Sequence, residues 1–304
     1  MRGSLGKSQS RLRTMRRLLL AWYRSSARSL PWRKTRNPYR ILISEVMLQQ
    51  TQVNRVLIHY RAFLKRFPSL RSLSQANTAS VLQAWRGLGY NNRAVRLRNL
   101  AHQVVENLDG ALPRTAEALE SLPGIGRYTA NAIACFAHEQ RVPVVDTNIH
   151  RVLSRLYPGT SGAPETWRLA EEILPGRNAY SWNQALMELG ALVCTPTSPL
   201  CSRCPINSLC PSAFTVRSAA RKLRYREPGY DGMPNRIYRG RIIETLRNLN
   251  GRHSISSEKL GKQIKKGFSS RDRTWLDGIL SDLERDGLVR TRTRDGRRTV
   301  SFAE

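Results

Sequence analysis

Four of the five cysteines in this 304-residue chain lie within one short segment. They are Cys194, Cys201, Cys204 and Cys210, in the spacing C-x6-C-x2-C-x5-C. Four thiolates in a single loop suit a metal centre, because a compact loop can wrap a single ion or an iron–sulfur cluster. Zinc and iron–sulfur fit this spacing equally well, so the spacing alone leaves the metal open. The fifth cysteine, Cys135, lies in the apolar run NAIACFA and is expected to be a buried hydrophobic residue.

A single carboxylate interrupts the most basic part of the chain. Residues 1–105 contain 21 Lys and Arg but one acidic residue, Glu45. A carboxylate within a surface that binds a polyanion opposes that binding, because it repels phosphate. Glu45 is therefore either an incidental surface residue of a generally basic protein or a residue with a chemical role, and charge alone leaves both open.

The charge of the whole chain indicates a polyanionic partner. It has 51 Lys and Arg against 22 Asp and Glu, a formal charge of +29, which favours nucleic acid. A hydrophobic content of 40% excludes a wholly disordered basic tail. The absence of an apolar run of about 18 residues excludes a membrane span. The basic N-terminus has no convincing cleavage site, so we expect an intracellular protein, cytoplasmic and associated with the nucleoid.

The segment LESLPGIGRYTANAIACFA, residues 119–137, has the pattern of a helix-hairpin-helix. An apolar helix end is followed by the turn PGIG and then by a new helix. The glycines allow a tight turn, and their amides, with the next helix N-terminus, can face a DNA phosphate. We therefore expect Gly124, Gly126 and Arg127 to contact the DNA backbone. The alternative is an ordinary turn between two helices.

The elements around these motifs are expected to be mainly helical through residue 210. A basic amphipathic helix is expected within residues 1–30, and apolar residues at three- and four-residue spacing predict that residues 39–67 are helical. Shorter helices are predicted near 68–85, 91–109 and 114–120, each bounded by Pro, Gly or Asn. Strand patterns are scarce, so the predicted fold class is all-α.

The C-terminal part of the chain predicts a second fold. Within residues 236–304, three helical segments precede two β-prone runs around the turn pair Asp295-Gly296. Three helices and a basic hairpin are typical of a winged helix, and the alternative is an irregular helical cap on the main domain. Residues 216–235 are polar and contain Pro and Gly, so they are predicted to be a linker.

Together these features resemble the helix-hairpin-helix DNA glycosylases of the endonuclease III superfamily, and most closely the adenine DNA glycosylases of the MutY type. Similar segments, in the same order, are LPWRKTRNPYRILISEVMLQQTQV (30–53), GLGYNNRA (87–94), LPGIGRYTANAIA (122–134), VDTNIHRVLSRL (145–156) and WNQALMELGALVCTPTSPLCSRCPINSLC (182–210). The resemblance implies a [4Fe–4S] cluster on the four cysteines. It also implies two helical lobes, 32–140 with the hairpin and 1–31 with 141–215 around the cluster, to which the winged-helix-like domain is appended.

The resemblance assigns catalytic roles to Glu45, Asp146 and Tyr128. Glu45 would protonate N7 of an adenine flipped out of the duplex, since a carboxyl in a closed pocket has a raised pKa. Asp146 would stabilise the oxocarbenium-like sugar, and it can at the same time be the N-cap of the next helix. Tyr128 occupies the position of the Schiff-base lysine of bifunctional relatives. A phenol forms no Schiff base, which predicts a glycosylase without lyase activity.

Base-binding and DNA-binding roles follow from the same resemblance. Arg33 and Gln184 are expected to contact the extruded adenine, with Asn183 as a weaker candidate and Trp32 in the pocket wall. The residues expected to contact DNA around the flipped base are Leu48, Gln50 and Tyr90. The alternatives are a solvated helix position for Gln50 and a core aromatic for Tyr90.

Two departures from the family leave the base opposite the adenine open. The tail is shorter than the family's Nudix-like lesion-recognition domain, and Asn91 stands where the family often has a second Tyr. We expect a monomeric enzyme that excises adenine from A:G or A:8-oxoG pairs in double-stranded DNA. One alternative is a thymine or uracil glycosylase for G:T or G:U mismatches. Another is a non-catalytic, cluster-containing DNA-binding regulator.

Overall fold

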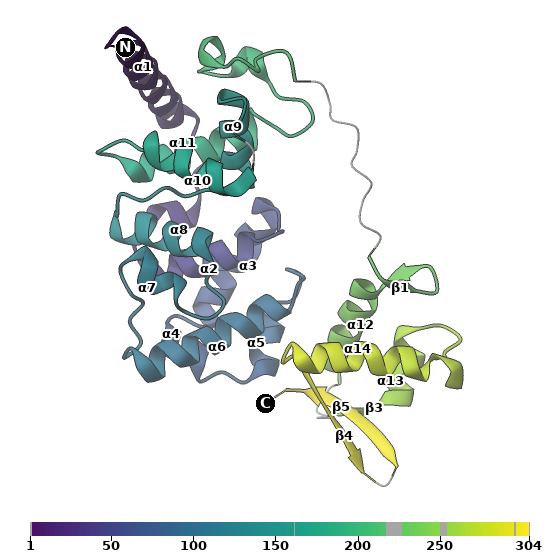
Figure 1. Cartoon of the computed structure of the whole chain (residues 1–304). Coiled ribbons are helices and arrows are strands. Elements are labelled where there is room, and N and C mark those ends of the chain that lie inside the picture. Colours follow the sequence, from purple (N-terminus) through teal and green to yellow (C-terminus); the bar gives the residue numbers. More distant parts are fainter. Residues whose placement is uncertain (1, 161, 217–226, 250–253, 295, 304) are drawn as a thin grey trace. The chain divides into compact units, whose positions relative to one another are not determined.

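The computed structural model describes residues 2–160, 162–216, 227–249, 254–294 and 296–303. These residues are mainly helical (Figure 1), and the chain divides into two compact units. The first unit is Met1–Glu45 with Leu112–Lys222, and the second is Val46–Ala111 with Leu223–Glu304. The units thus join residues 46–111 with the C-terminal stretch, a grouping that differs from the predicted lobes. The lobe boundaries stay a prediction.

The first unit is built from helices and short 3-10 turns. Its elements are α1 (Arg2–Ser26), η1 (Pro31–Lys34), most of α2 (Pro38–Leu48), α7 (Ala116–Glu120), α8 (Arg127–His138), α9 (Thr147–Leu156), α10 (Gly162–Glu172), α11 (Ala179–Leu192), η2 (Cys201–Arg203) and η3 (Asn207–Leu209). α11 packs against α1, α8 and α9. Trp182 and Leu189 of α11 are buried, as are Leu19 of α1 and Leu153 of α9, so the core of the unit lies around α11.

The second unit begins with four helices, of which α4 and α5 pack against α6 while α3 packs against α5. They are α3 (Val53–Arg66), α4 (Leu70–Ser74), α5 (Thr78–Ala84) and α6 (Asn92–Asn107). Ser69 and Asn77 cap α4 and α5 through their side chains, which explains why these two short helices start where they do. The fully buried rings of Phe63 and Trp85 meet edge to face, with centroids 5.7 Å apart.

Residues 39–67 are mainly helical, as predicted, and they form two helices, α2 and α3. Gln50 between them has a φ of 55°, in the left-handed region. The last carbonyls of α2 bind the guanidinium of Arg93, which donates to the oxygens of Val46 and Met47 at 2.8 and 3.0 Å. Arg93 belongs to α6, which is distant in the sequence. The apolar pattern of residues 39–67 therefore does not indicate where α2 ends.

The C-terminal stretch has the predicted three helices and hairpin. Its elements are α12 (Asn235–Arg247), β3 (Ile255–Ser256), α13 (Ser257–Ile264), η4 (Ser270–Asp272), α14 (Arg273–Arg285), β4 (Val289–Arg294) and β5 (Arg297–Phe302). The strands pair antiparallel in the order β3-β5-β4, with Val289 opposite Phe302 and Arg294 opposite Arg297. The predicted α+β domain is thus confirmed. Asp295 of the predicted turn lies outside the described residues.

Part of the segment predicted as a linker is folded. Residues 217–226 lie outside the described residues, whereas β1 (Gly229–Tyr230) and β2 (Met233–Pro234) form a small antiparallel hairpin. Tyr230 stacks on Trp275 of α14 with ring centroids 4.4 Å apart, and its hydroxyl donates to Asp272 at 2.7 Å. These contacts join the hairpin to the C-terminal domain.

Within the second unit, α12 contacts the connection between α5 and α6. Arg247, in the last turn of α12, donates to the oxygen of Leu82 at 2.8 Å and to Asn91 Oδ1 at 3.0 Å. Glu244, one turn earlier, forms an ion pair with Arg86. The C-terminal domain thus reaches the position at which the family often has a second Tyr.

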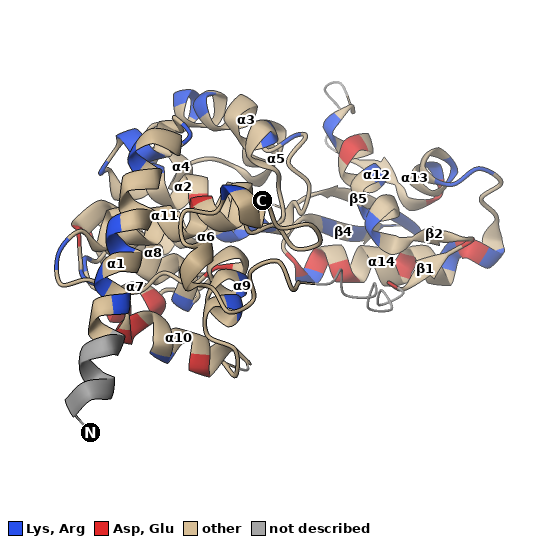
Figure 2. Ribbon diagram, turned by 90° about the horizontal axis from the view of Figure 1, so that it is seen from above, with Lys and Arg blue, Asp and Glu red and all other residues tan. Residues whose placement is uncertain are grey.

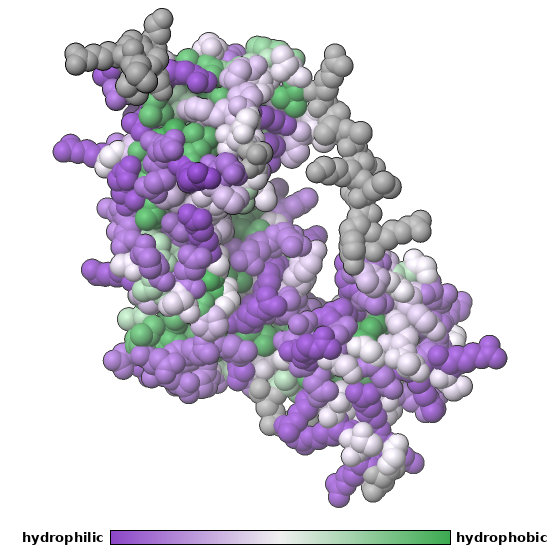
Figure 3. Space-filling model, in the orientation of Figure 1, coloured by the Kyte–Doolittle hydropathy of each residue, from purple (hydrophilic) through white to green (hydrophobic). Residues whose placement is uncertain are grey.

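The surface is polar, with uneven charge. Basic side chains are spread over α1 and α3, whereas acidic ones occur on α7, α10 and α14 (Figure 2). Hydrophilic residues predominate on the face shown in Figure 3. Among the helices that the structure describes, none combines the length and the apolar character needed to cross a membrane.

Candidate functional site

Glu45 lies in the last turn of α2, in a run, residues 41–47, that is buried throughout. It is 5% exposed, and the Tyr128 hydroxyl donates to its Oε2 at 2.6 Å. Burial is the main cause that raises the pKa of Glu45 to about 7. The hydrogen bond from Tyr128 and the charge of Arg33 oppose this rise, while the negative charge of Asp146 adds to it. The carboxyl is therefore partly protonated at neutral pH, as a general acid must be.

Tyr128 reaches Glu45 because it is the second residue of α8, directly after the hairpin. Burial, followed by the negative charges of Glu45 and Asp146, raises the pKa of Tyr128 well above its ordinary value. The phenol therefore remains protonated near neutral pH and serves as a hydrogen-bond donor to the carboxyl.

The hairpin between α7 and α8 leaves backbone amides available to an anion. Gly124 has a φ of 83°, a conformation that favours glycine. Gly126 is the exposed N-cap of α8, and in the described structure no side chain bonds the first amides of that helix. Arg127 is exposed, and its guanidinium lies over the ring of Trp167, 4.2 Å from the centroid. The geometry fits the expected phosphate contact, which stays a prediction.

Asp146 is the N-cap of α9, as expected. Its carboxylate accepts hydrogen bonds from the Ile149 N–H at 2.7 Å and from the Asn148 side-chain amide at 2.8 Å. Burial raises the pKa of Asp146, and these hydrogen bonds oppose the rise. Gly190 of α11 permits the close packing here, since a Cβ at that position would lie 2.7 Å from Cβ of Asn148.

Arg33 and Gln184, the expected adenine contacts, are hydrogen-bonded to each other. Arg33 Nε donates to Gln184 Oε1 at 2.8 Å, and its Nη2 pairs with Glu188 Oε2 at 2.8 Å. Glu188 is buried and also pairs with Arg28 at 2.7 Å. Although burial opposes ionisation, the hydrogen bonds from the two arginines hold the pKa of Glu188 at about 2.

Glu188 is a site residue that the sequence analysis did not predict. Its signal is that it is the one charged residue of helix α11, four residues after Gln184 and so on the same face. A buried acid of this kind requires a cationic partner, which identifies the face of α11 that Arg33 approaches.

Asn183 is buried, and its side-chain amide is occupied by the backbone. Its Oδ1 accepts from the Val144 N–H at 3.1 Å, and its Nδ2 donates to the Val142 oxygen at 3.0 Å. These bonds hold the segment that leads into Asp146, so Asn183 has a positioning role and its contact with the base stays a prediction. Trp32 in η1 is buried, which agrees with a place in a pocket wall.

Leu48, Gln50 and Tyr90 belong to the second unit. Tyr90 is 53% exposed with a φ of 44°, and Gln50 is exposed with a φ of 55°. Both lie in turns, so Gln50 is not a helix position and Tyr90 is not a core aromatic. Leu48 is the half-buried last residue of α2. Contact of the three with DNA stays a prediction.

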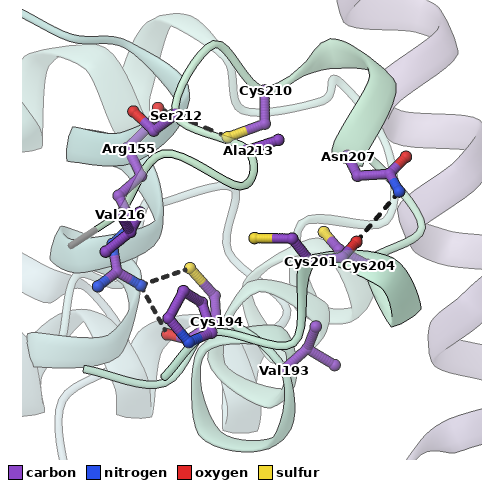
Figure 4. Close-up of a pocket in the computed structure, with 11 residues that line it drawn as sticks. Arg155, Val193, Cys194, Cys201, Cys204, Asn207, Cys210, Ser212, Ala213 and Val216 are labelled. Carbon is purple, nitrogen blue, oxygen red and sulfur yellow. Dashed lines mark hydrogen bonds between the residues drawn. The ribbon is translucent and has the colours of Figure 1, made fainter. Parts of the chain in front are cut away.

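Cys194, Cys201, Cys204 and Cys210 line one cavity (Figure 4). Cys194 follows α11, while the other three lie in and after the turns η2 and η3. Arg155 of α9 donates to the Cys194 sulfur at 3.2 Å, and Figure 4 shows it beside that thiol. Burial is the main cause that raises the pKa of the Cys204 thiol to about 11, and the other three thiols add to the effect. Thiolates here therefore require a positively charged partner.

Four cysteines around one cavity are the donor set that a [4Fe–4S] cluster uses. Tetrahedral zinc needs four sulfurs at about 2.3 Å from one point. A [4Fe–4S] cluster holds its cysteines on different iron atoms, so its ligands surround a wider cavity.

A chain of hydrogen bonds connects the cysteine loop with Asp146. The Asn148 amide donates to Asp146 and accepts from Arg151 Nη2 at 2.9 Å. Arg151 Nε in turn donates to the Cys194 oxygen at 2.8 Å. The cysteine loop, which a bound cluster would hold in place, is therefore hydrogen-bonded to the first turns of α9.

Two family models match the chain in these regions. Residues 43–175 match the HhH-GPD superfamily of base excision DNA repair proteins. Residues 194–210 match the iron–sulfur binding domain of endonuclease III. The first match includes the buried acid and the hairpin, and the second begins and ends at a cysteine of the cavity.

This chain is similar to named adenine DNA glycosylases, and the share of each relative's length that it covers differs. The adenine DNA glycosylase of Mycolicibacterium smegmatis is 40% identical over 287 residues, which cover 92% of this chain and 93% of that protein. The human adenine DNA glycosylase is 46% identical over 207 residues, 63% of this chain and 38% of the human protein. The chain thus spans less than half the length of the human relative.

A solved structure of a thermostable thymine-DNA glycosylase shares the fold, with a TM-score of 0.66 and 29% identity, over 69% of this chain and 99% of that one. The fold is that of the helix-hairpin-helix superfamily of base excision DNA repair proteins. Within it, the chain belongs to the adenine DNA glycosylase family, and the matched cysteine segment assigns it a [4Fe–4S] cluster.

The raised pKa of Glu45 makes stability depend on pH. The pKa rises from 4.5 in the unfolded chain to about 7 in the folded protein, so wild-type stability falls as pH rises through this window. Glu45→Gln carries no such proton and is expected to be more stable than wild type by about 1–3 kcal/mol at about pH 8, with a smaller gain at about pH 5. Urea unfolding at both pH values measures the difference. The exposed Glu120→Gln is the control, and an equal gain at both pH values would contradict the assignment.

The cysteine cavity predicts about four iron atoms per chain and the broad visible absorbance of an iron–sulfur cluster. Cys201→Ser is expected to lower both iron content and absorbance, because it removes a ligand. Cys135→Ser is the matched control, since Cys135 is buried outside the cavity and should leave both unchanged. Zinc bound without iron would contradict the cluster.

Proposed function

We propose that this protein removes adenine mispaired with guanine or 8-oxoguanine in double-stranded DNA, and that it hydrolyses the N-glycosidic bond without cutting the strand. The observation that carries the proposal is Glu45, a buried carboxyl with a pKa of about 7 that is bonded to Tyr128. Adenine leaves readily only when it is protonated, and this carboxyl can hold the required proton. The similarity to relatives named adenine DNA glycosylases supports adenine as the base.

The reaction begins with an adenine flipped out of the duplex and held beside Glu45. Glu45 transfers its proton to N7, the C1′–N9 bond breaks, and its electron pair leaves with the base. Positive charge then develops on the sugar, and the oxygens of the Asp146 carboxyl group stabilise it. A water molecule adds to C1′ and gives its proton to the Glu45 carboxylate, which restores the acid. Exclusion of solvent around Glu45 strengthens each of these charge interactions.

Arg33 and Gln184 would orient the base. The bond from Arg33 fixes the Gln184 oxygen, so the amide hydrogens of Gln184 remain to bond an acceptor on the adenine edge. Glu188 fixes Arg33 from the other side, and buried Trp32 would close the pocket wall. This arrangement supports selection of a planar base with acceptor nitrogens.

The remaining residues would bind the duplex. Gly124, Gly126 and Arg127 would contact the phosphates at the hairpin, and the exposed turns at Gln50 and Tyr90 would fill the gap that the flipped base leaves, together with Leu48. The protein would act as a monomer on DNA. Tyr128 has no amine, so no Schiff base with the sugar and no strand cleavage are expected.

A second candidate is the removal of thymine or uracil opposite guanine. The thymine-DNA glycosylase structure, at 29% identity and a TM-score of 0.66, favours this alternative. The acid and tyrosine of this site suit either reaction, so the excised base must be determined by experiment.

Excision from a panel of duplexes (A:8-oxoG, A:G, A:C, T:G and U:G) tests the proposal. We expect base release from A:8-oxoG and A:G, and a rate that falls about tenfold per pH unit above pH 7, where Glu45 loses its proton. Glu45→Gln is expected to lose at least about a hundredfold in single-turnover rate while DNA affinity is kept, and Glu120→Gln should match wild type. Full activity of Glu45→Gln would refute the acid, preference for T:G would support the second candidate, and no release from any duplex would support a non-catalytic regulator.

The absence of a lysine at position 128 predicts a product with an intact strand. After base release, the abasic strand should break only on treatment with alkali, and borohydride should trap no covalent complex. A bifunctional glycosylase with a catalytic lysine serves as the positive control. Trapped protein–DNA complex would show that another amine attacks the sugar.

A further inference from the structure

Arg93 is a buried cation that is bound by backbone oxygens. It is the second residue of α6 and is 8% exposed. Burial lowers the pKa of Arg93 to about 10, and the neighbouring group that opposes this effect is Tyr90, with no carboxylate contributing. The guanidinium is thus still charged at neutral pH, and its stabilisation must come from the dipoles around it.

The two terminal nitrogens of Arg93 bond two separate turns. Nη1 donates to the oxygens of Val46, Met47 and Gln49, at and beyond the end of α2, and Nη2 donates to Thr51 Oγ1, Leu88 O and Gly89 O. The carbonyl end of α2 carries partial negative charge, which favours a cation at this place. One side chain therefore ties the α2–α3 turn (residues 49–52) to the turn before α6 (residues 87–91).

The two turns that Arg93 joins have an unfavourable backbone conformation, which hydrogen bonds from Arg93 can stabilise. Gln50 and Tyr90 have left-handed backbones, with φ of 55° and 44°, which is unfavourable for residues with a Cβ. The Arg93 guanidinium also lies 5.6 Å from the centroid of the Tyr90 ring and 5.4 Å from that of Trp85. The Trp85 indole N–H donates to the Gly89 oxygen at 3.1 Å. Tyr90 is consequently held in place although half of it is exposed.

We propose that Arg93 is a positioning residue that locks these two turns into one rigid unit, so that Gln50 and Tyr90 enter the duplex together when the mispair opens. This role rests on the proposed function. Arg93 itself touches neither the base nor the reacting atoms. It acts before the chemical step, by making the opening of the pair favourable, and its loss should affect only substrates in which a pair must be opened.

The test compares Arg93→Lys with the matched control Arg98→Lys in the full-length protein. Arg98 is also on α6, but its Nε donates to one carbonyl, that of Ala76, at 2.6 Å. Lysine keeps the charge at position 93 and loses the fork that spans two turns. Each variant is given an A:8-oxoG duplex and a duplex in which the adenine lies opposite an abasic site, where no pair has to be opened. A 2-aminopurine beside the adenine reports the opening by fluorescence.

We expect Arg93→Lys to weaken binding and slow the fluorescence rise on A:8-oxoG by about tenfold, and to remain within about twofold of wild type on adenine opposite the abasic site. Arg98→Lys should match wild type on both. Equal losses on both duplexes, or no difference from Arg98→Lys, would overturn the proposal. Wild-type protein that releases no adenine from either duplex would instead show that the proposed function fails.

A second variant covers the case in which Arg93→Lys does not fold. Thr51→Val removes one acceptor of Arg93, at 3.0 Å, and leaves the arginine in place. It should show the same selectivity between the two duplexes with a loss of about threefold.

Methylguanidine should partly restore the paired-duplex activity of Arg93→Ala, because it can occupy the vacated site. Wild-type behaviour of Thr51→Val on both duplexes would overturn the proposal.

Discussion

A carboxyl group buried in a protein needs a hydrogen-bond partner, and Glu45 finds one within the first unit. Tyr128 supplies the donor, and it is in place because α8 begins directly after the hairpin. The positive charge of Arg33 lowers the pKa of Glu45 and so opposes the effect of burial, and Arg33 is itself held by Glu188. The hairpin and the acid are thus in direct contact, and the expected base contact Arg33 acts on the acid through its charge.

The arginines of this chain serve two different purposes. Some are exposed and can meet phosphates, whereas Arg33, Arg93 and Arg151 bind acceptors inside the protein. Each of these three joins segments that are distant in the sequence, because a guanidinium has five donors in a fixed plane. The charge of +29 is therefore partly structural, and only the remainder is available to a polyanion.

Sequence analysis singled out residues whose type and local spacing are unusual outside a functional site. The acid in a basic stretch, the PGIG turn and the four cysteines each have a local pattern, and the C-terminal helices and hairpin follow from periodicity and turn chemistry. The break between α2 and α3 and the role of Glu188 were not predictable in this way. The end of α2 and the buried Glu188 are each bound by the guanidinium of an arginine that is distant in the sequence. The propensities of residues within one segment carry no information about such a distant partner.

The contacts of Arg93 respond to salt differently from contacts between surface arginines and phosphates. Its partners are carbonyl and hydroxyl oxygens in a buried site, which added salt screens far less than it screens exposed ion pairs. The attraction between surface arginines and phosphates weakens steeply as ionic strength rises. Rising salt would thus weaken the hold of surface arginines on a polyanion while the shape of the two turns that Arg93 joins stays the same.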